Sequence, residues 1–356
     1  MKAINIDNLS FGGRKLNSVV LVNEEKIDLL PSLFLFDRAI QSKAISSVRA
    51  NAEDLCSFLN VVYSSSGNLQ AQDITRRQMD VYIYSYLKSK RGLSQISIDR
   101  HCATLKAFYR WMYCAGFIST PKQFYFPKHR TPSRDSGSDV GSKYISLAGL
   151  KTLKENVLGE TPFIRERNEL ILDLGYHCGF RAHEIVINFL NYRNVESALA
   201  EAQSRSEESF RVSIVGKGGK VRTIVVPPTV QIKIHKYLKR RKRLPEGPLI
   251  CSQSGRQLNN QYPSLIFSDS LARMPFDKRE MLGDKTYHCL RHSYATNLVT
   301  SCYENGRDPQ MILPDLMGHE SFSTTLKYIA WEAFLNNRVD VIERLSLKEH
   351  RHQSHG

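Results

Sequence analysis

The segment from 288 to 298, HCLRHSYATNL, places His288, Arg291 and His292 within five positions of one another. Helix positions three or four apart share a face, so these side chains gather on one side of a helix beside its apolar stripe. An arginine offers a planar fork of donors that suits a phosphate, and a bound anion relieves the repulsion between the cations. The segment predicts an anion-binding helix. Taken alone, it is also explained by a histidine-capped helix with a solvated arginine.

A second arginine follows a glycine that ends a helix. Gly179 closes the helical pattern of RNELILDLGYHC, Arg181 comes two positions later, and Glu184 lies three positions beyond the arginine. In a helical turn this spacing lets the carboxylate orient the guanidinium. The same pattern occurs in ordinary surface pairs of arginine and glutamate, which contribute little to stability. This motif therefore indicates a function only in combination with the others.

A tyrosine and a lysine supply further chemistry. In LMGHESFSTTLKY, 316 to 328, Gly318 ends a helix, His319 follows it, and Tyr328 falls early in the next helix. A packed core aromatic is the ordinary role of such a tyrosine. The hydrophobic period changes to two in FRVSIVGKGGKVRTIVVP, which predicts a β-hairpin over 210–226 with Lys217 near its tip.

Together these residues favour covalent chemistry on a phosphodiester without a metal. The arginines, histidines and lysine neutralise the phosphate and stabilise a crowded pentacoordinate transition state, and the tyrosine supplies a nucleophile. These segments lack the carboxylate clusters that a magnesium nuclease needs. We therefore expect neither a metal nor a cofactor. In chain order the candidate catalytic residues are Arg181, Lys217, His288, Arg291, His319 and Tyr328.

That order resembles the tyrosine recombinases, also called the phage integrase family. His319 precedes Tyr328 by nine positions, as a histidine does in the family, and GKGGKVRTIVVP is similar to the hairpin that carries the family's lysine. RHSYATNL is similar to the family's usual continuation after its second arginine. Five motifs in the right order are far more specific than any one of them.

The resemblance implies a role for each residue that holds the phosphate. Arg181 and Arg291 would clamp the non-bridging oxygens of the scissile phosphate, and His288 and His319 would join them. Glu184 occupies the family's supporting acidic position.

The resemblance also implies the reaction and its partners. Tyr328 would attack the phosphorus, leaving a 3′-phosphotyrosyl link and a free 5′-hydroxyl, and Lys217 would protonate that leaving oxygen. His292 would brace its helix and not touch DNA. Attack by the 5′-hydroxyl of a partner strand reverses the reaction without ATP. The expected partners are double-stranded DNA and a homo-tetramer on two duplexes, and accessory proteins remain open.

Length and local composition divide the chain. Its 356 residues exceed the usual size of one domain. Proline, glycine and serine crowd together in PKHRTPSRDSGSDVGSK, which predicts a basic linker. We expect an N-terminal extension at 1–31, a helical core-binding domain at 32–128, the linker at 129–143, a catalytic domain at 144–348 and a tail at 349–356. The fold class is mainly α with a small β-sheet or hairpin (α+β): an all-helical core-binding domain and a mixed α/β DNA breaking–rejoining catalytic domain. The polar stretch 192–209 reads as an exposed excursion.

The composition indicates a polyanionic partner. Lys and Arg number 50 against 35 Asp and Glu, which gives a net charge of +15, so nucleic acid is the first candidate and an anionic membrane surface the second. No run of about 18 apolar residues predicts a membrane span. The first residues lack the apolar core of a signal peptide, so we expect a cytoplasmic, nucleoid-associated protein. The seven scattered cysteines contain no Cys-x-x-Cys pair and read as reduced thiols.

Basic residues of the predicted helical domain are candidates for lining a phosphate backbone. They are Arg76, Arg77, Lys88, Lys90, Arg91, Arg100 and Lys106. A solvated helix face accounts for the same charges.

Several functions fit these patterns. The first is a site-specific DNA recombinase that serves integration, excision or transposition of a mobile element. Its alternatives are a recombinase that resolves chromosome dimers, and a DNA-binding regulator that kept the fold without turnover. A DNA-relaxing topoisomerase would act without a defined site. The complete catalytic set argues against the regulator, because a binding module gains little from a tyrosine nucleophile.

Overall fold

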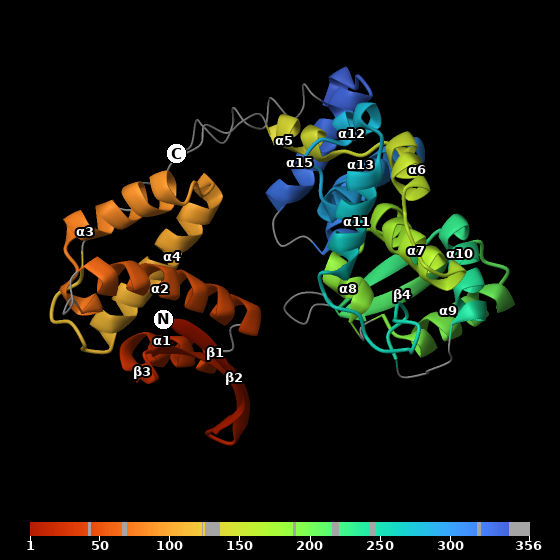
Figure 1. The fold of residues 1–356 in the computed structure, drawn as a ribbon. Coiled ribbons are helices and arrows are strands. Elements are labelled where there is room, and N and C mark those ends of the chain that lie inside the picture. Colours follow the sequence, from red (N-terminus) through yellow and green to blue (C-terminus); the bar gives the residue numbers. More distant parts are fainter. Residues whose placement is uncertain are drawn as a thin grey trace. The chain divides into compact units, whose positions relative to one another are not determined.

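The computed structural model describes residues 1–41, 44–65, 70–122, 124, 136–187, 190–215, 221–241, 247–318 and 322–341. The chain divides into two compact units, Met1–Arg130 and Thr131–Gly356 (Figure 1). Each unit has its own hydrophobic core. Both are mainly helical, in agreement with the expected fold class, and each contains a small antiparallel sheet. The sheet of the first unit was not part of the all-helical domain that the sequence predicted. Within the described ranges, none of the helices combines the length and the apolar character needed to cross a membrane.

The first unit combines a three-stranded sheet with helices. Its elements are β1 (Lys2–Phe11), β2 (Arg14–Asn23), β3 (Lys26–Asp28), α1 (Leu29–Ile40), α2 (Ile45–Ser65), the 3₁₀ helix η1 (Ala71–Asp73), α3 (Arg76–Asp80), the π-helix η2 (Val81–Lys90) and α4 (Gln95–Cys114). The strands pair antiparallel in the order β1-β2-β3, and the sheet packs against α1 and α2.

The sheet joins the core of the helical unit. Val19 and Leu21 are alternate residues of β2, so they face the same side, and both are buried among the helices. The stretch 1–31, expected to be an extension, is therefore corrected to a part of the first unit. The apolar run VVLV, 19 to 22, is the physical reason, because the strand that contains it must cover apolar side chains.

The second unit carries the remaining elements. They are α5 (Ser136–Lys143), α6 (Leu147–Glu155), α7 (Pro162–Cys178), α8 (Ala182–Val186), α9 (Tyr192–Ser204), β4 (Phe210–Val215), β5 (Val221–Val226), α10 (Pro228–Arg240), α11 (Tyr262–Arg273), α12 (Phe276–Leu282), α13 (Tyr287–Glu304), α14 (Pro309–Met317) and α15 (Phe322–Leu335). Helix α7 is buried along most of its length, and α10 and α13 pack against it.

The local signals read from the sequence are confirmed at the ends of several elements. Ser146 caps α6, since its hydroxyl oxygen accepts a hydrogen bond from the backbone N–H of Gly149 at 3.1 Å. Gly179 ends α7 with φ 67° and Gly318 ends α14 with φ 59°, both in the left-handed conformation that glycine adopts readily. Strands β4 and β5 form the predicted hairpin, paired from Phe210↔Val226 to Val215↔Val221.

Part of the expected linker is a helix. Helix α5 lies within the stretch 129–143 and packs against α15. Its Val140 is buried in one cluster with Tyr328, and a Cβ at Gly141 would clash with the indole ring of Trp331. The linker prediction is therefore corrected for 136–143. Serine and glycine suggested a loop there, but the glycine instead allows the helix to approach an indole ring closely.

The expected excursion at 192–209 is also wrong over most of its length. This stretch forms α9, and four of its side chains are buried, namely Tyr192, Val195, Leu199 and Ala202. They recur every three or four positions, so one narrow apolar stripe suffices to hold an otherwise polar helix against β4.

We predict that Gly179→Ala lowers the free energy of unfolding by about 2–5 kcal/mol, the sum of a left-handed alanine and a steric clash. A Cβ at this position would collide with the ring of Tyr294. Gly306→Ala is the matched control, because Gly306 has φ 63° but no neighbouring atom lies within 4 Å of the point that a Cβ would occupy, and we expect a loss of about 1–2 kcal/mol. Urea denaturation measures the free energy of unfolding of both variants, and equal losses would contradict the steric clash with Tyr294.

Candidate active site

Helix α13 is pinned to the core by its first residue. Tyr287 is buried, and its hydroxyl donates a hydrogen bond to the carbonyl oxygen of Ile171 on α7 at 3.1 Å. A Cβ at Gly175 would lie 2.5 Å from the same hydroxyl, so a glycine is needed for the two helices to meet. This contact fixes the direction of α13 and with it the side chains that follow one turn later.

Arg291 projects from α13 into the protein. Its side chain is buried, and its two terminal nitrogens donate to the carbonyl oxygens of Gly179 and Met317. Those carbonyls lie at the ends of α7 and α14, where a helix leaves its last acceptors without partners. Burial lowers the pKa of Arg291, and the neighbouring Arg222 and Arg181 lower it further. A guanidinium nevertheless stays protonated in proteins, so it brings a positive charge to this point.

Arg181 and Glu184 form the predicted pair, but the acid is buried and is not part of a surface pair. Nη1 of Arg181 lies 2.9 Å from Oε1 of Glu184, and the backbone N–H of Arg181 donates to Oε2 at 2.7 Å. The arginine side chain remains partly exposed. Glu184 thus holds both the backbone and the side chain of Arg181, and leaves the rest of the guanidinium open to an anion.

Arg222 of β5 is a residue of this site that the motifs did not reveal. Its Nη2 lies 2.5 Å from Oε2 of Glu184, and its Nη1 donates to the carbonyl oxygen of Leu316 at 2.8 Å. Along β5 the buried positions alternate, and Arg222 is one of them together with Ile224 and Val226. An arginine at an inward-facing strand position is the signal that identifies it, because a buried charge requires a partner.

The pKa of Glu184 reflects these neighbours. Burial alone would raise it, but the guanidinium of Arg222 and the Arg181 amide, followed by Arg291 and the Arg181 side chain, bring it below its ordinary value. The acid is therefore ionised at neutral pH. Three guanidiniums then surround one carboxylate, which leaves a surplus of positive charge for an anionic ligand.

His288 lies within electrostatic range of the same cations. Burial lowers the pKa of its imidazole, and Arg291, Arg181 and Lys143 lower it further. Its ring packs edge-to-face against that of His292, with centroids 4.7 Å apart. The imidazole is thus poised to donate to an anion and to gain a proton when one binds.

Tyr328 lies on α15 at the same place. Its side chain is 5% exposed, and its hydroxyl lies 2.8 Å from Nδ1 of His292. It is also close enough to Arg291 to affect the pKa of that residue. The sequence assigned His292 a bracing role, whereas the structure brings it into direct contact with the tyrosine hydroxyl. That tertiary contact joins the two motifs that the sequence could only place in order.

Two predicted catalytic residues, Lys217 and His319, lie outside the described residues. The described chain ends at Val215 and resumes at Val221 on either side of the hairpin tip, and Gly318 immediately precedes the histidine. Their roles rest on the sequence.

The seven basic residues expected to contact DNA are exposed in the first unit. They lie on α3 (Arg76, Arg77), on η2 (Lys88, Lys90), just after it (Arg91) and on α4 (Arg100, Lys106). Arg100 and Arg91 are held by short polar contacts: Nη2 of Arg100 lies 2.9 Å from Oδ1 of the buried Asp54, and Nη1 of Arg91 donates to Oγ of Ser57 at 3.2 Å. These two arginines are therefore more ordered than a freely solvated face requires.

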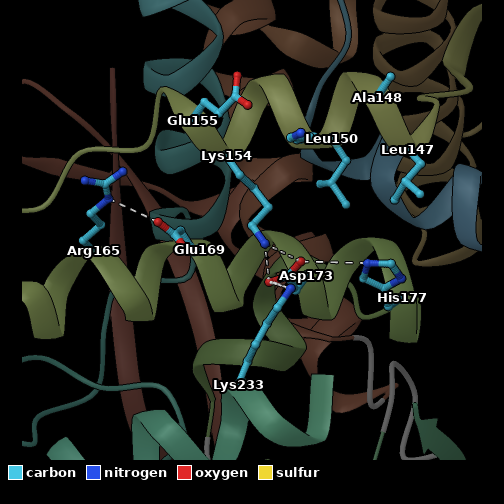
Figure 2. A pocket seen from close by; sticks show the side chains of 11 residues that line it. Leu147, Ala148, Leu150, Lys154, Glu155, Arg165, Glu169, Asp173, His177 and Lys233 are labelled. Carbon is cyan, nitrogen blue, oxygen red and sulfur yellow. Dashed lines mark hydrogen bonds and ion pairs between the residues drawn. The ribbon is translucent and has the colours of Figure 1, made fainter. Parts of the chain in front are cut away.

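A cleft of about 680 Å³ lies between α6, α7 and α10 in the second unit (Figure 2). At its base the buried Asp173 accepts hydrogen bonds from Lys154 at 2.9 Å and from Lys233 at 2.7 Å, and His177 lies 3.9 Å away. Its lining shares no residue with the site around Tyr328. These ion pairs tie α6 and α10 to α7, the helix that leads to Gly179 and Arg181.

No metal centre is found within the part of the chain that the structure describes. There, no three histidine, cysteine, aspartate or glutamate side chains gather closely enough to hold a metal ion.

Comparison with known sequences identifies relatives along most of the chain. The model of the phage integrase family matches residues 156–333. A tyrosine recombinase XerC of Mesorhizobium japonicum is 32% identical over 322 residues, which cover 86% of this chain and 89% of the relative. A tyrosine recombinase XerD of Oceanobacillus iheyensis is 24% identical over 298 residues, covering 82% of this chain and 89% of the relative.

Solved structures share the fold. XerH site-specific recombinase bound to difH substrate in a pre-cleavage complex has a TM-score of 0.57 at 16% identity, covering 85% of this chain and 81% of that one. A lambda integrase tetramer bound to a Holliday junction has a TM-score of 0.56 at 14% identity, with coverage of 84% and 76%. On the sequence evidence, and in agreement with the fold, the chain belongs to the phage integrase family of tyrosine recombinases.

Proposed function

We propose that this enzyme is a site-specific DNA recombinase that cleaves and rejoins DNA through a 3′-phosphotyrosyl intermediate. The observation that carries the proposal is the 2.8 Å contact between the hydroxyl of Tyr328 and Nδ1 of His292, beside the surplus of positive charge around Glu184. A nucleophile, a proton acceptor and an anion-binding group thus occupy one place.

Each described side chain has a step in the reaction. Arg181, Arg291 and His288 bind the non-bridging oxygens of the scissile phosphate and stabilise the charge of the pentacoordinate transition state. The hydroxyl of Tyr328 passes its proton to Nδ1 of His292 as its oxygen attacks the phosphorus. The tautomer of His292 with a free Nδ1 is an assignment that this step requires.

Completion of the step exchanges one phosphoester for another. The bond from phosphorus to the 5′-oxygen breaks as the bond to Tyr328 forms, and Lys217 protonates the leaving oxygen. His319 joins the groups that hold the phosphate. The 5′-hydroxyl of a partner strand then attacks the phosphotyrosine and restores the tyrosine, so the bond energy is conserved and no ATP is needed.

The assembly and setting follow from the same proposal. Exchange between duplexes calls for a homo-tetramer on two DNA duplexes, and a lambda integrase tetramer was solved bound to a Holliday junction. Accessory proteins and a nucleoid-associated location fit this role. Similarity to proteins named XerC and XerD favours the resolution of chromosome dimers over the integration or transposition of a mobile element.

A regulator of the same fold without catalytic activity is the second candidate. The basic first unit suits DNA binding by itself. The contact between Tyr328 and His292 argues against this candidate, because DNA binding requires neither a nucleophile nor a base beside it. A DNA-relaxing topoisomerase would use the same chemistry, and it would differ in cleaving without dependence on sequence.

Removal of the Tyr328 hydroxyl tests the nucleophile. The protein mixed with nicked DNA fragments that span the junctions of its native genetic locus should form a covalent adduct, visible on a denaturing gel, and Tyr328→Phe should lose it while still binding DNA. The phenyl ring keeps the packing in the cluster around Val299 and lacks only the attacking oxygen. An adduct that persists in Tyr328→Phe would rule out this nucleophile.

Truncation of the two clamping arginines tests the phosphate site. Arg181→Ala and Arg291→Ala should each slow cleavage by about 100-fold to 1,000-fold, as expected when one donor to a developing charge is removed. Arg165→Ala is the matched control, because Arg165 forms an exposed pair with Glu169 on α7, and its rate should stay within about twofold, as such surface pairs contribute little. A loss of less than about tenfold at both sites would contradict the assignment.

The salt dependence of DNA binding tests the basic surface of the first unit. If this unit neutralises several phosphates, the affinity should fall linearly with salt on a double-logarithmic plot, with a slope near −0.9 per phosphate contacted. Arg77→Ala should flatten that slope by about one, whereas Arg14→Ala, an exposed arginine outside the seven candidates, should leave it unchanged. Fluorescence anisotropy on a labelled duplex measures the slope. A flat profile for the wild type would contradict DNA binding by this surface.

A further inference from the structure

Arg222 has contacts with two parts of the site that are far apart in the sequence. Its Nη2 pairs with Glu184 at 2.5 Å and its Nη1 donates to the carbonyl oxygen of Leu316 at 2.8 Å. We propose that Arg222 is a positioning residue, which sets both the carboxylate that orients Arg181 and the helix end from which His319 follows. This inference rests on the proposed recombinase function and goes beyond the residues that the motifs identify.

The first contact fixes the plane of the Glu184 carboxylate. One oxygen, Oε1, pairs with Nη1 of Arg181 at 2.9 Å, and the other, Oε2, pairs with Arg222. A carboxylate held from both sides cannot rotate, so the guanidinium of Arg181 is presented in one orientation. Without Arg222, only Arg181 itself would hold the acid, and the two side chains could turn together.

The second contact fixes the end of α14. Leu316 and Met317 are the last residues before Gly318, and their carbonyl oxygens accept from Arg222 and Arg291 respectively. Two guanidiniums therefore hold adjacent carbonyls that the helix leaves without partners. A Cβ at Gly318 would lie 3.3 Å from Cδ of Arg222, so the turn before His319 is built closely against this side chain.

The position of Arg222 on β5 links a third element. It pairs with Ile214 across the β4–β5 hairpin, and α14 packs against β5. One side chain thus connects the hairpin, the acid beside Arg181 and the helix end before His319. A buried ion pair is weak evidence for a gain in stability, because desolvation of both charges offsets their attraction. Its geometric effect on the neighbouring groups is the stronger reason for its presence.

The test compares Arg222→Met and Arg222→Lys with Arg211→Met, in which an exposed arginine of β4 is replaced. The assay measures the rate of the Tyr328-dependent adduct on a nicked duplex that the wild type cleaves, and DNA affinity by anisotropy. We expect Arg222→Met to slow adduct formation by about 10-fold to 100-fold, the effect of a small misplacement of reacting groups, while its DNA affinity stays within about twofold. Arg222→Lys keeps the positive charge but loses the planar fork of donors, so its rate of adduct formation should lie between those of the wild type and Arg222→Met.

The pH profile separates positioning from a general loss of structure. The charged and titratable groups around Glu184 are Arg181, Arg222, Arg291, His183 and Tyr287. Burial raises the pKa of Glu184, and Arg222 is the largest influence that lowers it. Arg222→Met should therefore lose activity at a higher pH than the wild type as the solution is acidified, because protonated Glu184 no longer holds Arg181. A merely structural role would lower the rate equally at every pH.

Failure of the positioning role of Arg222 can be distinguished from failure of the proposed recombinase function. A wild type that forms no Tyr328-dependent adduct would overturn the recombinase proposal itself. An active wild type together with an Arg222→Met variant that matches Arg211→Met in rate and pH profile would overturn the positioning role. If thermal unfolding shows that Arg222→Met does not fold, Arg222→Lys decides the matter, and a wild-type rate in that variant would overturn the requirement for a fork.

Discussion

Glu184 is buried and still ionised because two guanidiniums and a backbone amide surround its carboxylate. The site depends on this one negative charge. One negative charge cannot neutralise the three guanidiniums of Arg181, Arg222 and Arg291, so the interior of the second unit holds uncompensated positive charge. Desolvated charges of one sign are tolerated only when a counter-charge is near. In the proposed reaction the scissile phosphate would supply this counter-charge, so the group of cations would be complementary to the substrate itself.

The remaining architecture keeps these cations in place. Arg291 ties the ends of α7 and α14 together through their free carbonyls, and Tyr287 pins α13 to α7 at the opposite end of the first turn. Asp173 adds ion pairs that hold α6 and α10 to the same helix. Every contact lies at a helix end or along α7. Side chains from distant parts of the sequence therefore meet at the ends of α7 and of the helices that pack against it.

Local patterns in the sequence were enough to predict the helix ends at Gly179 and Gly318 and the hairpin of β4 and β5, because each depends on neighbouring residues alone. The order of the motifs along the sequence predicted the family to which the chain belongs. The contact of Tyr328 with His292 arises from tertiary packing, for which no single motif carries a signal. The burial of Arg222 is indicated only by its inward-facing position on β5. Composition misled at α5 and α9, where a few apolar residues among polar ones hold a whole helix.

The packing of α5 against α15 has a practical consequence for any attempt to express the second unit by itself. Gly141 lies against the indole of Trp331, and Val140 is in one cluster with Tyr328. A fragment that begins at residue 144, where the composition places the boundary, would lack α5 and leave this side of α15, the helix that carries Tyr328, exposed. The bared aromatic surface would favour aggregation, so an active fragment has to begin before Ser136.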